Sequence, residues 1–155
     1  MIKKTIAGLV LSSMALFALP NNEVELVMMS KALQKKAVVL ATMDLKGETK
    51  EKFGKLYDEY QKKLLKQRVS ELHLIKEYAK NYTNLTDKTA NKLIKQWITD
   101  EEAKMVLTKE YMAKFKKVMP SSDVIRYFQI ERRLQTLRDA QISSVIPLAT
   151  PALTK

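Results

Sequence analysis

The sequence predicts an all-α protein in which two long helices form an elongated antiparallel hairpin, with an N-terminal and a C-terminal helix packed on it. Three observations predict this fold. Apolar residues make up 46% of the chain, which is enough for a folded core. Glycine occurs 3 times and proline 4 times in 155 residues, so few turns interrupt the chain. Large apolar residues also recur at steps of three, four and seven from Thr49 to Tyr82, the spacing of one helix face.

The first twenty residues have the outline of a secretory signal peptide. Lys3 and Lys4 precede an apolar run from Ile6 to Leu19. This run is shorter than the roughly 20 residues that a membrane-spanning helix needs, although an uncleaved anchor is the competing interpretation. Residues 1–20 are therefore expected to direct export to the periplasm, and residues 21–155 to form a single helical domain.

The first helix of this domain is expected to end at about Met43. Lys31, Lys35 and Lys36 fall outside its apolar stripe, so we expect these lysines to point away from the core. The residues expected on the buried stripe are Leu26, Met29, Leu33, Ala37 and Leu40.

A turn at residues 44–48 leads into the long helix from Thr49 to Tyr82, which would be roughly 50 Å long. A second connection at residues 81–84 leads to a third helix from about Asp87 to Met119, with Thr86 as its N-cap. Two helices of similar length joined by a short turn pack antiparallel, which predicts the hairpin.

The third helix carries the only tryptophan, Trp97, which is expected to pack in the interior against the long helix. Met105, Met112 and Met119 recur every seven residues, about 10.5 Å along a helix, which is too far for two thioethers to bind one copper ion. They are therefore expected to form a packing seam. Pro120 ends this helix, and a fourth helix is expected over about residues 122–145.

The start of the third helix also resembles a known family. Leu85-Thr86-Asp87-Lys88-Thr89 is similar to the Leu-Thr-x-x-Gln helix-start motif of the small exported proteins related to Spy and CpxP, with Leu85, Thr86 and Thr89 at motif positions and threonine in place of glutamine. The resemblance implies a curved helical hairpin, often dimeric, and a role as a chaperone that uses no ATP, an inhibitor of envelope-stress sensor kinases or a metal-responsive protein. The turn Val118-Met119-Pro120 and the segment Tyr127-Phe128-Gln129-Ile130-Glu131 resemble the last turn and helix of a proteobacterial branch of similar periplasmic proteins. The likeness extends over nearly all of the chain after the signal segment.

The residue inventory indicates no enzyme, cofactor or metal site. Cysteine is absent, which excludes disulfides and a thiol nucleophile. His73 is the only histidine and is expected to face solvent, because a metal site usually needs two to four ligands. Neighbouring acids such as Glu101 and Glu102 point in different directions on a helix and accompany no nucleophile.

The net charge of +11 gives the clearest functional indication. Export argues against a nucleic-acid partner, so basic side chains are expected to attract unfolded or acidic protein clients, with apolar side chains holding them. Two alternatives remain open: a regulatory module that docks on a membrane sensor kinase, and a structural protein at an anionic membrane surface. A homodimer is also expected. The predicted client-binding residues are Lys62, Lys63, Lys66, Arg68, Lys116, Lys117, Arg126, Arg132 and Arg133.

Overall fold

The computed structural model describes the backbone of residues 21–149 and the side chains of residues 31–149. The predicted signal segment, residues 1–20, lies outside the described residues. Within the described part, the chain forms the helices α3 (Asn21–Met43), α4 (Gly47–Asn81), α5 (Asp87–Phe115) and α6 (Ser121–Ser143). The prediction of an all-α fold is confirmed.

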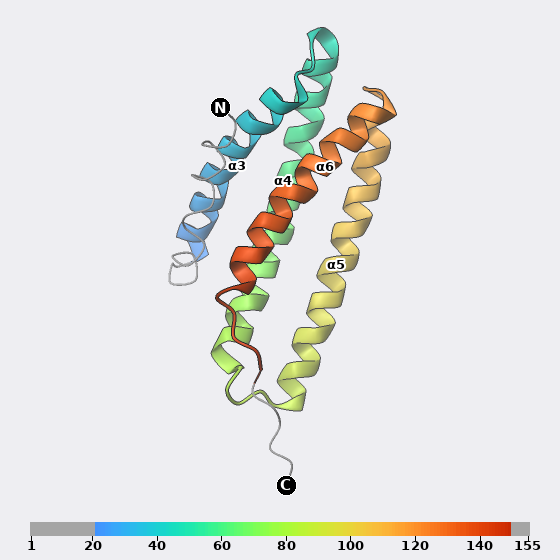
Figure 1. Ribbon diagram of the computed structural model, residues 1–155. Coiled ribbons are helices and arrows are strands. Elements are labelled where there is room, and N and C mark those ends of the chain that lie inside the picture. Colours follow the sequence, from blue (N-terminus) through green and yellow to red (C-terminus); the bar gives the residue numbers. More distant parts are fainter. Residues whose placement is uncertain (1–20, 150–155) are drawn as a thin grey trace.

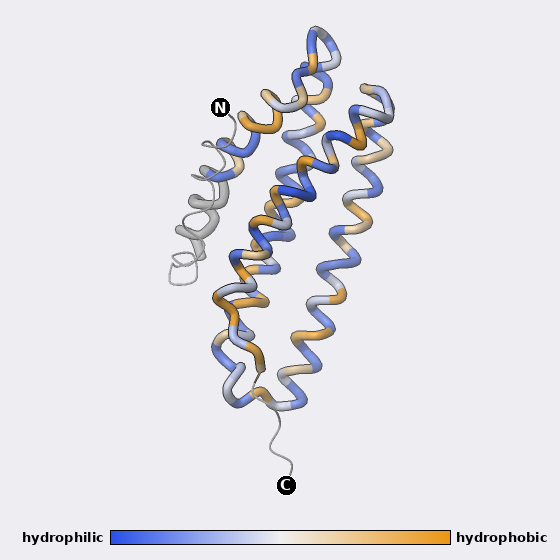
Figure 2. The backbone as a smooth tube through the Cα atoms, viewed as in Figure 1, coloured by the Kyte–Doolittle hydropathy of each residue, from blue (hydrophilic) through white to orange (hydrophobic). Residues whose placement is uncertain are grey.

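The two longest helices, α4 and α5, lie side by side and antiparallel, and they form the predicted hairpin (Figure 1). Helix α6 begins beside the end of α5 and crosses obliquely toward α4, whereas α3 lies along α4 on the opposite side from α5 (Figure 1). Apolar and polar residues alternate along both hairpin helices (Figure 2). This alternation is typical of helices that bury one face and expose the other.

Local sequence signals place most of the helix ends. The Oγ1 atom of Thr86 accepts a hydrogen bond from the backbone N–H of Thr89 at 3.3 Å, so the predicted N-cap of α5 is confirmed. Gly47 opens α4 with a φ of 51°, a left-handed conformation that glycine adopts without a steric penalty. The prediction that the third helix reaches Met119 is wrong, because residues 116–119 form a turn in which the Met119 N–H donates to the Phe115 carbonyl.

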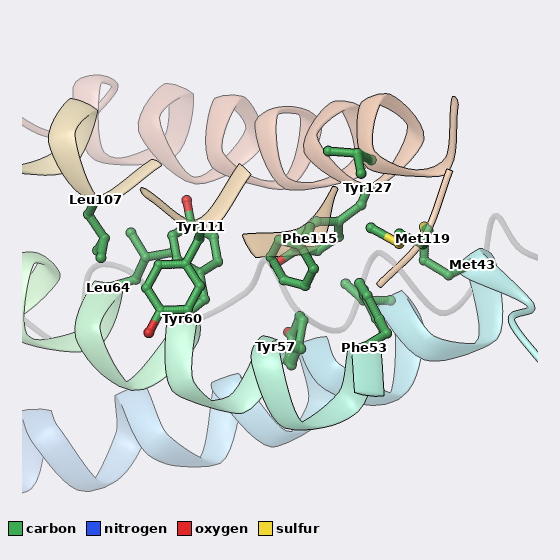
Figure 3. Close-up of a cluster of buried hydrophobic side chains, with 12 residues drawn as sticks. Met43, Phe53, Tyr57, Tyr60, Leu64, Leu107, Tyr111, Phe115, Met119 and Tyr127 are labelled. Carbon is green, nitrogen blue, oxygen red and sulfur yellow. The ribbon is translucent and has the colours of Figure 1, made fainter. Parts of the chain in front are cut away.

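Aromatic side chains form the main core, at the end of the hairpin where α3, α4, α5 and α6 come together (Figure 3). Phe115 has ring-centroid distances of 4.8 Å to Tyr127 and 5.4 Å to Phe53, and Tyr60 lies 5.0 Å from Tyr111. Such aromatic pairs contribute about 0.5–1.5 kcal/mol each beyond their area burial. The core residues with almost no exposed surface are Val39, Phe53, Tyr57, Tyr111, Phe115, Val124 and Tyr127.

The predicted buried face of α3 is wrong at Leu33 and Ala37, which are exposed, whereas Leu40 packs against the core as predicted. Leu33 is 72% exposed, whereas Lys35, Val39 and Met43 are buried, four residues apart on a different face of the helix. Leu26 and Met29 precede the described side chains. Lys35 can face inward because Glu131 and Gln61 meet its ammonium group, a pairing that the sequence of α3 alone does not reveal.

The predicted burial of Trp97 and the methionine seam are also corrected. Trp97 is 58% exposed and Met105 is 60% exposed, whereas Met112 is half-buried and Met119 is buried. The reason is the oblique path of α6, which lies over the C-terminal half of α5 and then diverges toward α4 (Figure 1). The N-terminal half of α5 therefore has a partner on one side only, and its wide apolar surface is not fully covered.

A candidate binding groove between α4, α5 and α6

The divergence of α6 from α5 leaves a groove lined by all three C-terminal helices. Its volume is about 660 Å³, and side chains from α4, α5 and α6 line it. At the end near the aromatic core, Tyr60 and Thr108 share a hydrogen bond of 3.3 Å between α4 and α5. The opposite end lies beside the exposed part of α5. A volume of this size falls within the range of about 300–1,000 Å³ that is typical of ligand sites.

One wall of the groove is apolar. Helix α5 contributes Trp97, Met105 and Met112, and Phe128 of α6 lies near them in the lining. The exposed apolar surface of α5 continues outside the groove. We define the α5 stripe as the four large, half-exposed apolar residues of this region: Ile94, Trp97, Ile98 and Met105.

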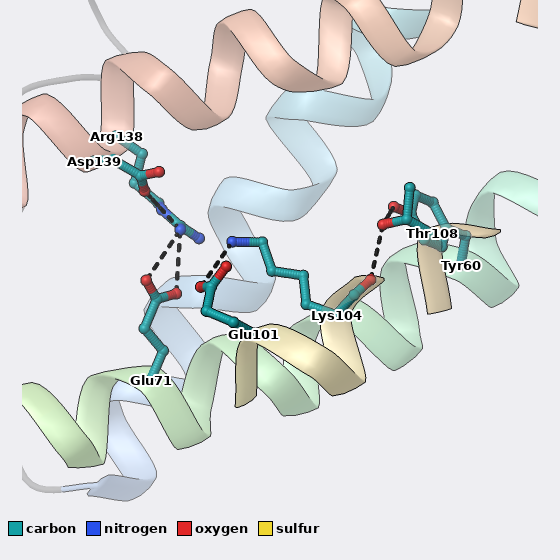
Figure 4. Close-up of polar contacts among 7 residues, drawn as sticks. All are labelled: Tyr60, Glu71, Glu101, Lys104, Thr108, Arg138 and Asp139. Atoms are coloured by element: carbon teal, nitrogen blue, oxygen red, sulfur yellow. Dashed lines mark hydrogen bonds and ion pairs between the residues drawn. The ribbon is translucent and has the colours of Figure 1, made fainter. Parts of the chain in front are cut away.

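The polar part of the lining is connected by ion pairs (Figure 4). Arg138 of α6 donates to Glu71 of α4 at 3.1 Å and to the neighbouring Asp139 at 2.7 Å. Within α5, Lys104 and Glu101 form a looser pair at 3.4 Å. The Arg138–Glu71 pair joins α6 to α4 and holds α6 on the side of the groove away from α5.

Asp100 of α5 has a different environment from the paired carboxylates. It accepts a hydrogen bond from the Ser70 hydroxyl of α4 at 3.1 Å and another from the Gln96 amide at 2.9 Å. These donors are neutral, so the charge of Asp100 has no cationic partner among the residues that the structure describes. The hydrogen bond from Ser70 links α4 to α5.

A buried polar network lies behind the groove and ties α3 to α4 and α6. The Lys35 ammonium donates to Glu131 at 2.5 Å and to the Gln61 carbonyl oxygen at 3.0 Å. The Gln61 amide nitrogen in turn donates to Glu131 at 3.0 Å and to the Tyr127 hydroxyl at 3.2 Å. Burial lowers the pKa of Lys35 to about 8, with Arg68 adding to this effect and the Glu131 carboxylate opposing it.

Arg68 of α4 lines the groove next to this network and is half-buried. Within the described residues it forms no ion pair, and its side chain donates no hydrogen bond. Burial and the like charge of Arg138 lower the pKa of its guanidinium, which nevertheless stays protonated because arginine begins from a very high value. Arg68 is thus a cation whose donors remain unused.

The structure brings together few of the nine predicted client-binding residues. Arg68 and Arg132 line the groove. Lys63 lies outside it and pairs with Glu110 of α5 at 3.2 Å. The exposed residues that lie elsewhere on the surface are Lys62, Lys66, Lys116, Lys117, Arg126 and Arg133.

Arg126 makes a structural contact and is not available to bind a client. Its guanidinium donates to the backbone carbonyl of Thr42 at 2.8 Å and so fastens α6 to the end of α3.

The groove itself is nearly balanced in charge, so it is not the basic binding surface that the composition predicted. Its charged lining residues are Arg68, Lys104, Arg132 and Arg138 on the basic side and Glu71, Asp100, Glu101, Glu131 and Asp139 on the acidic side.

The remaining motif and ligand candidates lie away from the groove. Of the motif positions, Leu85 and Thr89 are half-buried at the start of α5, and Thr86 is exposed and acts as the cap. His73 is exposed, as predicted. The described residues contain no group of three or more histidine, cysteine or acidic residues arranged to hold a metal ion.

Sequence reasoning missed the residues that shape the groove, above all Trp97 and Met105 as exposed side chains. The width of the apolar arc on α5 was the available signal. At 100° per residue, Leu93, Ile94 and Ile98 span about 140° of the helix surface, which is more than contact with a single neighbouring helix covers. Such an arc requires a second partner or leaves apolar surface exposed.

Comparison of the chain with protein-family models, with curated protein sequences and with solved structures finds no match. In the part of the chain that the structure describes, none of the helices is apolar over a stretch long enough to cross a membrane. The groove must therefore be interpreted from its own geometry and chemistry.

Proposed function

We propose that this protein binds segments of other polypeptides, as an exported chaperone or stress-response accessory of the periplasm that uses no ATP. The observation that carries the proposal is the α5 stripe, whose side chains lie half-exposed beside and within the groove. Contiguous exposed apolar surface next to polar residues is typical of protein interaction sites. The predicted signal segment supports the periplasmic location.

The size of the exposed surface fits weak, reversible binding. Full burial of a large apolar side chain contributes roughly 1.5–3 kcal/mol, so covering the exposed halves of the stripe contributes about 1 kcal/mol for each residue. A total of about 4 kcal/mol, before the entropy cost of association is subtracted, corresponds to a dissociation constant of about 1 mM or weaker for one segment. An unfolded client offers several such segments and so binds more tightly, yet it can dissociate without an energy source.

The homodimer that the sequence predicts is compatible with this proposal and stays a prediction. A second copy of the chain would compete for any surface that both it and a client cover. For that reason the client assay below should be run at several protein concentrations, since a competing dimer makes suppression per protein molecule fall as concentration rises.

The test is suppression of aggregation, with reduced α-lactalbumin as the unfolding client and light scattering as the measurement. We expect the purified protein to suppress scattering at equimolar amounts. A Trp97→Gln/Ile98→Gln variant should lose at least half of this suppression, because two large side chains of the stripe no longer bind apolar surface. Both residues are half-exposed, so the double substitution should change the free energy of unfolding by less than about 2 kcal/mol.

A matched control variant tests whether suppression depends on the α5 stripe or on exposed apolar side chains anywhere on the surface. Val106 is 66% exposed and Ile125 is 62% exposed, and neither lines the groove. A Val106→Gln/Ile125→Gln variant should therefore keep full suppression. Equal losses in the two double variants, or no suppression by the wild-type protein at any ratio, would contradict the proposed function.

A further inference from the structure

Arg68 gives the groove a chemical preference that the apolar stripe alone does not have. A guanidinium carries five N–H donors in a planar fork that matches a carboxylate. The side chain of Arg68 lines the groove, is half-buried, and has no hydrogen-bonding or ionic partner within residues 21–149. A half-buried cation with unused donors gains more from an acidic partner than a fully solvated one does.

The carboxylates that face Arg68 are already engaged by other cations. Glu131 accepts from Lys35 and from Gln61, and Glu71 accepts from Arg138. The remaining acidic residue of α6 in the lining, Asp139, also accepts from Arg138. Across the groove, Asp100 is held by the neutral donors Ser70 and Gln96. None of these carboxylates pairs with Arg68.

Burial is the largest cause that disfavours the charge of Arg68, and Arg138 adds to it, whereas the nearby carboxylates of Glu131 and Glu71 oppose it without pairing with Arg68. Arg138 lowers the pKa of Arg68, and Arg68 in turn lowers the pKa of Lys35. A carboxylate in direct contact with Arg68 would offset both its burial and the like charge of Arg138. The site is thus electrostatically suited to an acidic group, although the groove as a whole is nearly neutral.

Gln67 indicates that the acidic group belongs to a polypeptide and not to a free anion. Its Oε1 atom is buried and has no hydrogen-bond partner among the described residues, and Gln67 lines the groove beside Arg68. This atom is sealed from solvent, so it receives a donor from the groove only when the Gln67 side chain rotates outward, whereas Arg68 can bind a carboxylate where it lies. A polypeptide segment supplies both, through a backbone N–H and an acidic side chain, whereas a simple anion supplies acceptors only.

We propose that the groove selects polypeptide segments in which an aspartate or glutamate lies close to large apolar side chains. The carboxylate binds Arg68, and the apolar side chains cover Trp97 and Met105. The amide of Gln67 rotates toward the groove and accepts a hydrogen bond from a backbone N–H of the segment. This inference rests on the proposed function, because it specifies the clients of the same groove.

The test compares two peptides that differ in one charge. Both are twelve residues long, blocked at both ends, free of tryptophan, and built of leucine, phenylalanine and serine; one has a central glutamate and the other a central glutamine. Trp97 is the only tryptophan of the chain and lines the groove, so its emission reports binding there. The glutamate peptide should bind about tenfold more tightly, the expected effect of a hydrogen-bonded charge pair.

Variants assign the preference to one residue. Arg68→Gln should abolish the roughly tenfold preference for the glutamate peptide and leave the affinity for the glutamine peptide unchanged. Lys55→Gln is the matched control, since Lys55 is an exposed cation of the same helix that does not line the groove, and it should keep the full preference. Arg68→Lys, which keeps the charge and loses the planar fork, should give an intermediate preference.

The outcomes separate the inference from the proposed function. Equal affinity of the wild-type protein for both peptides would overturn the acidic preference and leave the proposed function standing. No change in Trp97 emission with either peptide would overturn both. The comparison of the two peptides on the wild-type protein decides the question even if Arg68→Gln fails to fold, as judged by circular dichroism.

Discussion

The two halves of the helical hairpin bury their apolar residues very differently. At one end, α6 crosses α4 and α5, and Phe53, Phe115 and Tyr127 are almost completely buried. At the other end, α6 has left α5, and Trp97 and Met105 are more than half exposed. Both halves of α5 carry an apolar face with helical spacing. The presence or absence of a third helix, and not the amphipathic pattern, decides which face becomes core and which becomes available surface.

This contrast implies a division of roles within one domain. The aromatic half supplies stability, because its residues pack at close distances and leave little exposed surface. The open half supplies a surface that a partner can cover, because the Arg138–Glu71 ion pair holds α6 against α4 and away from α5. Substitutions in the first half should therefore change stability, and substitutions in the second half should change binding.

The largest expected effect is on stability, from truncation in the aromatic half. Phe115→Ala removes a fully buried ring that contacts Phe53, Tyr111 and Tyr127, and should lower the free energy of unfolding by about 3–5 kcal/mol. Trp97→Ala removes an even larger side chain from the open half and should cost less than about 1.5 kcal/mol, because more than half of that side chain is exposed. Urea unfolding of both variants measures the difference, and equal losses would abolish the contrast between the halves.

The next effect concerns the ion pair that fastens α3 to the rest of the molecule. Lys35→Met leaves the Glu131 carboxylate buried without its cation and should cost about 3 kcal/mol. The double variant Lys35→Met/Glu131→Leu removes both charges and should regain most of that loss, since a buried pair can often be replaced by apolar residues. Chemical denaturation of the two variants is the measurement, and a double variant no more stable than Lys35→Met would contradict this explanation.

A pH titration of stability provides the control for the same pair. Lys35 has a pKa of about 8 in the folded protein and 10.5 when unfolded, so the unfolded state binds more protons between these values. Stability should therefore rise by about 1–2 kcal/mol between pH 7 and 9.5, then fall above pH 10, because burial raises the pKa of Tyr57 and Tyr127 and keeps both protonated in the folded state. The double variant should lack the rise.

Much of the fold follows from the sequence by local rules. The scarcity of glycine and proline predicts long helices, and Thr86 specifies the start of α5 through a cap that acts within three residues. The hairpin follows from two helices of similar length and a short connection. These features depend on neighbours in the chain, which a sequence displays directly.

The rest depends on contacts between distant residues, and for this reason the sequence did not predict it. Lys35 is buried only because Glu131, 96 residues later, meets its charge. Trp97 is exposed because α6 leaves α5, and the path of α6 depends on contacts with α3 and α4 that are distant in the sequence. Of the nine predicted basic residues, only Arg68 and Arg132 line the groove. The others were misplaced because the sequence positions of lysine and arginine do not reveal which helix faces enclose a cavity.

The most direct test of the open half is the fluorescence emission of Trp97 in the purified protein, before and after addition of reduced α-lactalbumin. The tryptophans of this client are replaced by phenylalanine, so that only Trp97 emits. Alone, Trp97 should emit at long wavelength and be readily quenched by acrylamide, because it is 58% exposed. Addition of the client should shift the emission to shorter wavelength and reduce quenching, because the client covers the α5 stripe. Emission at short wavelength without client, or an unchanged spectrum with it, would contradict a half-open hairpin whose groove holds other polypeptides.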